Sequence, residues 1–252
     1  MPAVARTDAW EMSAELDTRL LEYVPGRIWL KKYPVQYAGC DLFARASFIR
    51  LSNGDVLVHS PCPLDDSLRS QLGSIGPPRH ILAPGNFHHF HVGAWQNAFP
   101  EAKTWICPGV ERKCPELEFD GFLSDHAPAE WASELEQVLI RGNRIVWEVC
   151  FLDRPSKTLI LTDLVENIGD RTERTNWVLK FWWKVVMRMW NKPKPAPEYQ
   201  IGWSHKRAAR RSLERVVAWD FDRIIIAHGE NLETDAKNAL RRAWARPLSF
   251  GG

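Results

Sequence analysis

The sequence has few of the features that mark disulfide-bonded, zinc-finger or secreted proteins. Its five cysteines are an odd number, and no two of them form a C-x-x-C spacing. Neither a disulfide framework nor a zinc knuckle is therefore indicated. Residues 1–11 carry three charged side chains and no apolar run, which does not fit a secretory signal peptide. These observations predict a cytoplasmic protein.

Long hydrophobic runs are missing too, and the net charge is small. A membrane-spanning helix needs about 18 or more apolar residues, but the most apolar stretch, residues 177–190, is interrupted by Lys180, Lys184 and Arg188. The 33 basic and 31 acidic residues leave a net charge of +2, which argues against a dedicated nucleic-acid binder. With 252 residues, 45% of them hydrophobic, the chain can form one or two domains whose core needs no disulfide.

Charge is nevertheless unevenly distributed along the chain. Residues 171–215 contain twelve Lys or Arg against three acidic residues, and four tryptophans lie between residues 177 and 190. A basic aromatic helix suits an anionic membrane surface or a nucleic acid. The alternative is a helix packed over the fold or against a partner subunit, with its basic stripe in water. We expect this stretch to attract an anionic small-molecule substrate or to make peripheral contact with a membrane.

The pattern of apolar residues predicts a mixed α/β chain. Two β-prone runs joined by a Ser-Asn-Gly-Asp turn predict a hairpin over residues 46–59. Further strands are expected at 80–83, 104–107, 137–140, 144–152, 158–162 and 223–227, and helices at 64–72, 92–99, 176–190, 204–220 and 234–244. We interpret residues 46–252 as one domain, with an N-terminal extension over residues 1–45 packed on it and a basic, Trp-rich insert at about 171–203.

Three of the expected strands are followed by side chains that can bind a metal. His88, His89 and His91 follow one strand, Asp163 follows a second, and His228 follows a third. Imidazoles and a carboxylate gathered at one edge of a sheet suit zinc, with iron or manganese as alternatives. A bound metal lowers the pKa of coordinated water and so supplies hydroxide as a nucleophile, which is hydrolase chemistry.

Each of these residues also has a purely structural interpretation. The histidine cluster could cap backbone groups of a polar loop, Asp163 could cap the turn that follows it, and His228 could be a core histidine bonded to a carbonyl group. His59 and Cys62 lie in a rigid, proline-containing loop and are not interpreted as a catalytic pair. Glu148 lies in mid-strand and is interpreted as a solvent-facing or ion-paired carboxylate.

The order of these features resembles the metallo-β-lactamase superfamily over residues 48–230. The resemblance is carried by the Gly54 hairpin, the His-rich loop, the strand ending in Thr162-Asp163 and the closing segment Ala227-His228-Gly229-Glu230. Two further segments, residues 84–89 and 155–159, are similar to a branch of that superfamily described as a domain of unknown function. The resemblance implies an αββα sandwich with its site along one edge.

The superfamily's metal-binding motif is only partly present. The pattern His-x-His-x-Asp-His falls on Asn86, His88, Phe90 and His91, so its first His and its Asp are replaced. A third-motif His, which the resemblance places near Asn143, is missing. The ligands that remain for a single metal are His88, His91, Asp163 and His228, with His89 as an alternative to His91.

We therefore expect a metal-dependent hydrolase of an ester, thioester or phosphoester with a reduced, single-metal site. The other hypothesis is a non-catalytic module that keeps the fold, holds no metal, and uses the basic, Trp-rich insert to contact a membrane, a protein or a nucleic acid. Metal content of the purified protein separates the two hypotheses.

Overall fold

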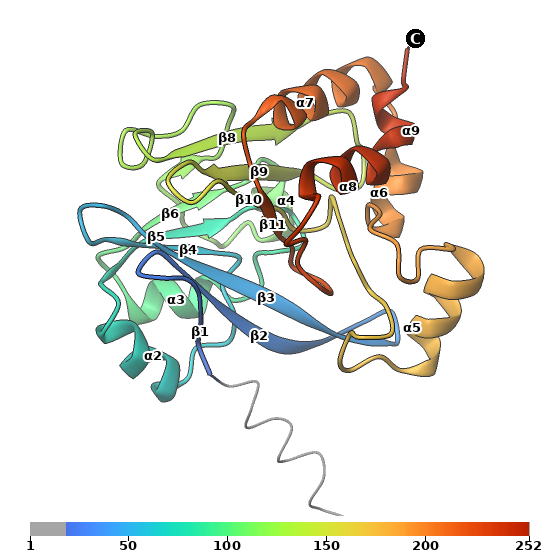
Figure 1. Cartoon of the computed structure of the whole chain (residues 1–252). Helices are drawn as coiled ribbons and strands as arrows, with labels where there is room; N and C mark the ends of the chain where they lie inside the picture. The colour runs from blue at the N-terminus through green and yellow to red at the C-terminus, as the bar shows by residue number, and fades with distance from the viewer. Residues whose placement is uncertain (1–18, 252) are drawn as a thin grey trace, which may run out of the picture.

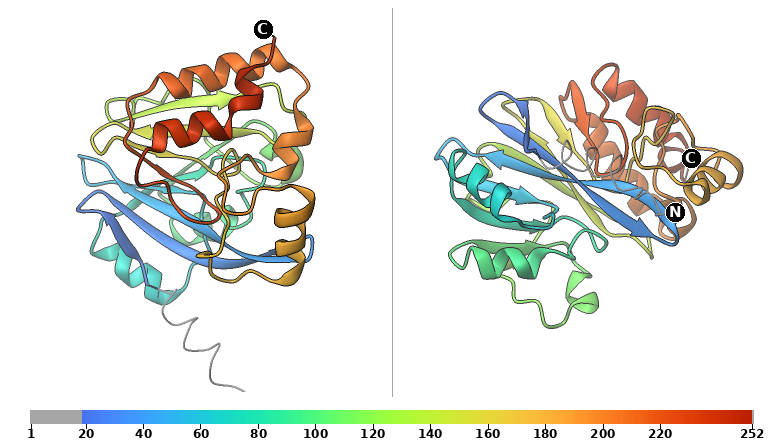
Figure 2. Two further views of the ribbon diagram at one scale, coloured as in Figure 1. Left: turned by 45° about the vertical axis from the view of Figure 1, so that its right-hand side comes forward. Right: turned by 90° about the horizontal axis from the view of Figure 1, so that it is seen from below.

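A computed structural model describes residues 19–251, which form two β-sheets packed face to face with helices on both outer sides (Figures 1 and 2). The first sheet contains, in spatial order, β1 (Leu21–Val24), β2 (Ile28–Tyr37), β3 (Cys40–Arg50), β4 (Val56–His59), β5 (Pro78–Ala83), β6 (Lys103–Ile106) and β7 (Gly121–Phe122). The second sheet contains β11 (Arg223–Ile225), β10 (Thr158–Ile160), β9 (Glu148–Asp153) and β8 (Leu135–Ile140).

Helices cover the outer face of each sheet and complete the αββα sandwich predicted from the sequence. The helical segments are α2 (Asp66–Gly73), α3 (Val92–Ala98), α4 (Val110–Lys113), α5 (Trp177–Phe181), a π-helix (Trp182–Val186), α6 (Pro197–Gly202), α7 (Lys206–Ala218), α8 (Ala236–Ala243) and α9 (Ala245–Leu248). Figure 1 shows α2 and α3 against the first sheet, and α7 and α8 against the second.

The core follows from this layering. Phe48 of β3 packs against Trp95 of α3, with ring centroids 5.7 Å apart, and both belong to one buried apolar cluster that also includes Phe151 of β9. A second cluster joins the outer face of the second sheet to α7 and α8, where Leu213 and Leu240 are fully buried. Because both faces of the central strands are covered, β9 is buried along its whole length, including the acidic residues Glu148 and Asp153 at its ends.

Strand direction brings the ends of several strands to one edge of the sandwich. In the first sheet β4, β5, β6 and β7 pair in parallel, so their carboxyl ends share an edge. In the second sheet β8, β9 and β10 form the predicted antiparallel meander, and β11 pairs in parallel with β10. Loops that leave the carboxyl ends of parallel strands are the usual place for a binding site in α/β folds.

The N-terminal part of the described chain belongs to the first sheet. The expected boundary between residues 45 and 46 falls inside β3, which pairs with β2 from Ile28↔Ile49 to Tyr37↔Cys40. The charged residues Lys31, Lys32 and Arg45 interrupt the apolar pattern of these two strands and conceal them in the sequence. Residues 1–18 of the expected extension lie outside the described residues.

The insert at about 171–203 lies beside the end of the β2–β3 hairpin (Figure 1). The helix expected over residues 176–190 is shorter: α5 continues into the π-helix, and Arg188 and Asn191 then adopt left-handed backbone conformations that end it. In the part of the chain that the structure describes, no helix has the length and apolar character needed to cross a membrane.

Candidate metal centre

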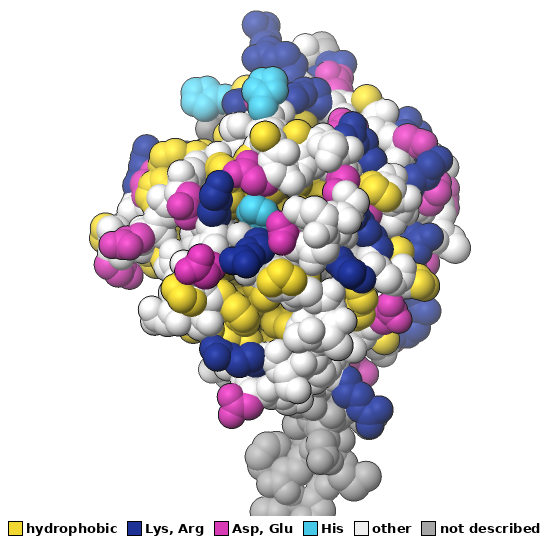
Figure 3. Space-filling view, turned by 90° about the vertical axis from the view of Figure 1, so that its left-hand side faces the viewer, with side chains coloured by type: hydrophobic (Ala, Val, Ile, Leu, Met, Phe, Trp, Pro, Cys, Tyr) yellow, Lys and Arg dark blue, Asp and Glu magenta, His cyan; other side chains and the backbone are white. Residues whose placement is uncertain are grey.

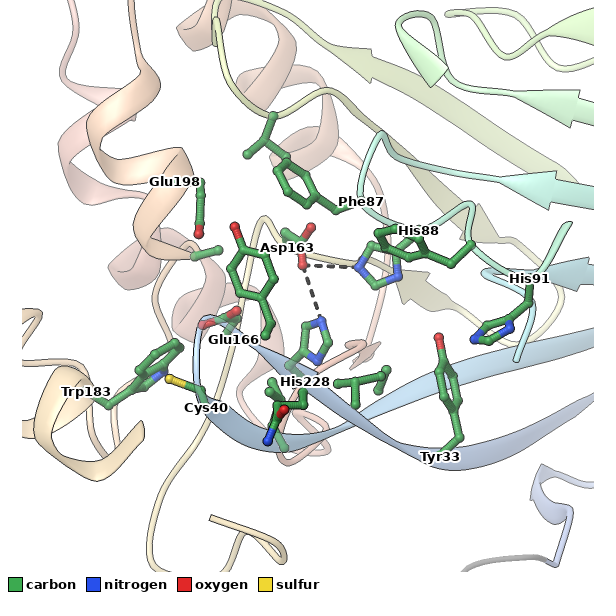
Figure 4. Close-up of a pocket in the computed structure, with 18 residues that line it drawn as sticks. Tyr33, Cys40, Phe87, His88, His91, Asp163, Glu166, Trp183, Glu198 and His228 are labelled. Carbon is green, nitrogen blue, oxygen red and sulfur yellow. Dashed lines mark hydrogen bonds and ion pairs between the residues drawn. The ribbon is translucent and has the colours of Figure 1, made fainter. Parts of the chain in front are cut away.

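Four strand ends bring polar side chains together at one edge of the sandwich. Ser60 follows β4, His88 lies in the loop after β5, Asp163 follows β10, and His228 follows β11. His88, Asp163 and His228 form a group whose ligand atoms all lie within 4.8 Å of one another. Figure 4 shows the His88 ring to the right of the Asp163 carboxylate and the His228 ring below it, with both contacts made to the same carboxylate oxygen.

The orientation of each histidine ring is set by a bond to its other nitrogen. His228 Nδ1 lies 3.0 Å from the carbonyl oxygen of Phe43, to which it can only donate, so its Nε2 carries the lone pair. His88 Nδ1 lies 2.8 Å from Ser60 Oγ, which can accept its proton in the same way. Metal-binding histidines are usually held by such a bond from the nitrogen that does not face the metal.

The spacing of the three side chains fits a bound metal ion. Asp163 Oδ1 lies 3.2 Å from His88 Nε2 and 3.5 Å from His228 Nε2. Two ligand atoms at about 2.0–2.2 Å from a tetrahedral zinc ion are about 3.3–3.6 Å apart. Two imidazoles and one carboxylate also leave coordination positions open, which catalytic metal sites require.

The charge distribution favours the ionised carboxylate. Burial would raise the pKa of Asp163, but His88 and His228 outweigh it and hold that pKa well below its usual range. Burial would lower the pKa of His228, whereas its bond to Asp163 and the charges of Asp163 and Glu166 raise it. A cation placed between these groups would interact favourably with the negative charge of Asp163.

Glu148 holds the Asp163 loop in place, a role that the sequence did not indicate. Its carboxylate is fully buried and accepts from the backbone N–H groups of Thr162 at 2.6 Å, Asp163 at 2.9 Å and Leu164 at 3.0 Å. Burial and the charge of Asp163 raise the pKa of Glu148 to about 8, against the three N–H groups that favour the carboxylate. Because Glu148 is fully buried, its interpretation as a solvent-facing side chain is wrong. In the sequence, an acidic residue inside an apolar run is the one sign that Glu148 has a buried role.

The His228 loop has its own support from Arg45 on β3. The buried guanidinium donates to the carbonyl oxygens of Ile226 and Gly229. Gly229 has φ of +91°, and a Cβ at this position would lie 2.2 Å from the carbonyl oxygen of Asn167. Glycine is therefore required next to His228, because the chain both turns to the left-handed region and passes close to a neighbouring backbone.

Two of the predicted ligands do not join the group. His89 stacks on Phe90, with ring centroids 4.5 Å apart, and lines a separate cavity. His91 precedes α3 and packs edge-on against Tyr33 at 5.5 Å, where it lines the same cavity as the metal centre without reaching the other ligands. Phe90, at the position of the motif Asp, is 73% exposed.

The two asparagines at motif positions serve the fold. Asn86 accepts from the N–H of Trp147 and donates to the carbonyl of Ile145, which ties the His88 loop to the segment before β9. Asn143 accepts from the N–H groups of Ile145 and Val146 and donates to the carbonyl of Tyr199 in α6. Both amide side chains are therefore engaged by backbone groups.

A cavity of about 350 Å³ opens beside the three ligands. Its lining residues from the insert include Trp183 and Glu198, so residues 171–203 flank the site (Figure 4). Glu166 also lines it and was not singled out in the sequence. Burial raises the pKa of Glu166 to about 8, and its Oε2 has no hydrogen-bond partner among residues 19–251.

The fold is the metallo-β-lactamase fold. The metallo-β-lactamase from Pontibacter korlensis matches 90% of this chain and 100% of its own, with a TM-score of 0.62 and 9% identity. FIM-1 from Pseudomonas aeruginosa in its mono-zinc form matches over 92% and 96%, with a TM-score of 0.61 and 9% identity. The enzyme from Erythrobacter litoralis matches over 92% and 94%, with a TM-score of 0.60 and 12% identity.

A family model matches residues 25–178, and the chain belongs to that family, described as "Domain of unknown function (DUF4336)". Comparison with the curated proteins finds no match.

Proposed function

We propose that the protein is a metal-dependent hydrolase with a single metal bound by His88, Asp163 and His228. The observation that carries the proposal is the convergence of these three ligand atoms within 4.8 Å, with each imidazole oriented by a bond to its second nitrogen. Zinc is the proposed ion, with iron or manganese as alternatives. FIM-1, which is similar in fold, has a mono-zinc form, so a single ion is compatible with this architecture.

A metal held by these ligands would supply a Lewis acid and lower the pKa of a coordinated water molecule. The chain's own residues then have distinct tasks. Ser60 and Phe43 keep the imidazoles in the binding orientation, and Glu148 keeps Asp163 in place. Burial raises the pKa of Glu166 to about 8 in the metal-free protein, which makes this residue the candidate to deliver a proton to the leaving oxygen or sulfur of the substrate; water would be consumed and an acid and an alcohol or thiol released.

The cavity lining favours an uncharged ester or thioester over a phosphoester. Apolar and aromatic side chains dominate it, including Val35, Leu42 and Phe87, and its acidic members are Asp163, Glu166 and Glu198. The described lining residues include no Lys or Arg to bind an anionic group. The basic residues of the insert lie outside the cavity, so an apolar acyl group is the substrate moiety that this lining supports.

Hydrolysis of matched chromogenic substrates tests the proposal. Zinc-loaded protein should hydrolyse neutral aryl esters or thioesters faster than an aryl phosphodiester. Asp163→Asn should lose about a hundredfold or more of kcat/KM, since it removes the charged ligand. His89→Gln, which changes a nearby histidine outside the group, should retain activity. Bound metal without hydrolysis of any of these substrates would refute the hydrolase and leave the metal site.

The second candidate is the non-catalytic module. It is favoured by the replacement of three motif positions by Asn86, Phe90 and Asn143, two of which bond to the backbone instead. A non-catalytic module should take up no zinc, iron or manganese, whereas the proposed hydrolase must bind one of these metals.

A further inference from the structure

One surface of the insert gathers large apolar side chains in water. On α5 and the π-helix, Trp177, Phe181, Trp182, Val185 and Val186 are exposed by 77, 49, 45, 58 and 45% respectively. These five residues are called the α5 surface below. Monomeric proteins rarely leave so many adjacent large apolar side chains uncovered without an interaction partner.

The helix that carries this surface is firmly anchored. On its inner side Leu179 and Trp183 are buried against Cys40 and Leu42 of β3. At its start Asn176 accepts from the N–H of Leu179 and donates to the carbonyl of Gly39. The outward direction of the α5 surface is therefore fixed by packing and capping on the opposite side of the helix.

Basic side chains border the α5 surface. Lys180, Lys184 and Arg188 are exposed, and none forms an ion pair within 4.0 Å with a residue of the described range 19–251. Asp170, in electrostatic range of Lys180 and Lys184, already accepts bonds from Trp190 and Asn191. On the opposite side of the molecule, by contrast, acidic and basic side chains are interspersed (Figure 3).

We propose that the α5 surface docks on a lipid bilayer with anionic headgroups. Tryptophan and phenylalanine enter the interfacial region of a bilayer while flanking lysines reach the phosphate groups, which complements both features of this surface. A second copy of the chain fits less well, because it would bring Lys180, Lys184 and Arg188 of the two copies face to face. Nucleic acid fits less well too, because Val185 and Val186 cannot stack on bases.

Docking would place the metal-centre cavity next to the bilayer. Trp183 lies on the π-helix between members of the α5 surface, and its side chain lines that cavity. The proposal does not depend on catalysis, since the surface and the site use different side chains.

Vesicle flotation with the full chain tests the docking. The wild type should float with vesicles of mixed phosphatidylcholine and phosphatidylserine, less with phosphatidylcholine alone, and less at raised salt. The variant Trp177→Ser/Phe181→Ser/Val185→Ser should bind anionic vesicles about tenfold or more weakly. Lys180→Gln/Lys184→Gln should reduce binding to anionic vesicles and leave binding to neutral ones unchanged.

The control variant is Phe119→Ser/Phe122→Ser, which removes an exposed aromatic pair away from the insert, with ring centroids 4.8 Å apart. It should bind vesicles as the wild type does. An unchanged far-ultraviolet circular dichroism melt verifies that each variant is folded. Absence of wild-type binding, equal binding by the apolar variant, or a dimer in light scattering that the same variant abolishes would each overturn the proposal.

Discussion

Replacing Glu166 by Gln should stabilise the metal-free protein, and it should lower the hydrolase activity of the metal-loaded protein. Glu166 is 5% exposed, and burial raises the pKa of its carboxyl from 4.5 to about 8. The folded chain therefore holds a proton that the unfolded chain releases between about pH 4.5 and pH 8. Because the pKa of Glu166 is higher in the folded chain, the free energy of unfolding keeps its full value below about pH 4.5. It then falls as the pH rises towards about 8.

The size of the effect follows from the width of that window. One pKa unit corresponds to about 1.4 kcal/mol, so at pH 7 the buried carboxyl lowers the free energy of unfolding by about 3 kcal/mol. Gln has nearly the same shape and does not ionise. We expect Glu166→Gln to raise the free energy of unfolding by about 2–3 kcal/mol at pH 7, and by less than about 1 kcal/mol at pH 5.

Urea unfolding of chelator-treated protein at both pH values measures this difference. The midpoint should rise in the variant at pH 7 with an unchanged slope against urea, since the surface exposed on unfolding is the same. Glu198→Gln, which lines the same cavity in a more exposed position, is the matched control and should change little. Parallel pH dependences in the wild type and Glu166→Gln would refute the reasoning.

Three further substitutions test the residues that position the site. Ser60 has φ of +55°, so Ser60→Gly removes the bond to His88 without backbone strain. Zinc affinity should fall about 10- to 100-fold with little loss of stability. Unchanged affinity in a zinc titration would contradict this. Glu148→Gln places an amide donor against the backbone N–H groups that hold the Asp163 loop and should lower zinc affinity about tenfold, as the same titration would show. Gly229→Ala should lower the thermal midpoint by several degrees, because its Cβ would collide with the carbonyl of Asn167; an unchanged melt would contradict the close approach.

The sequence predicts the layers and the strand ends of this fold because apolar periodicity is a local signal. The hairpin at 46–59, the meander of β8, β9 and β10, and the polar residues after β5, β10 and β11 all follow from it. Charged residues break the apolar pattern of the β2–β3 pair, so the sequence does not predict this pairing, and the boundary expected after residue 45 falls inside β3. The role of Arg45 cannot be predicted from the sequence, because it supports the His228 loop, which lies more than 180 residues away in the chain.

The choice among the three loop histidines could not be predicted, for a similar reason. His88 is selected by Ser60, 28 residues earlier in the chain, and His228 is oriented by a carbonyl 185 residues away. Glu148 and Glu166 carry no motif, because an acidic residue in or after an apolar strand gains its role only from the loops that pack around it. Orientation and burial in this site are tertiary properties.

Zinc binding by the metal-free protein, measured by calorimetric titration and by elemental analysis after dialysis, tests the central claim most directly. The account predicts about one equivalent for the wild type, for His89→Gln and for His91→Gln, since one centre with three protein ligands is proposed. It predicts loss of that equivalent in His228→Ala and in Asp163→Asn. A wild type that binds no metal, or a loss in His89→Gln as large as in His228→Ala, would contradict it.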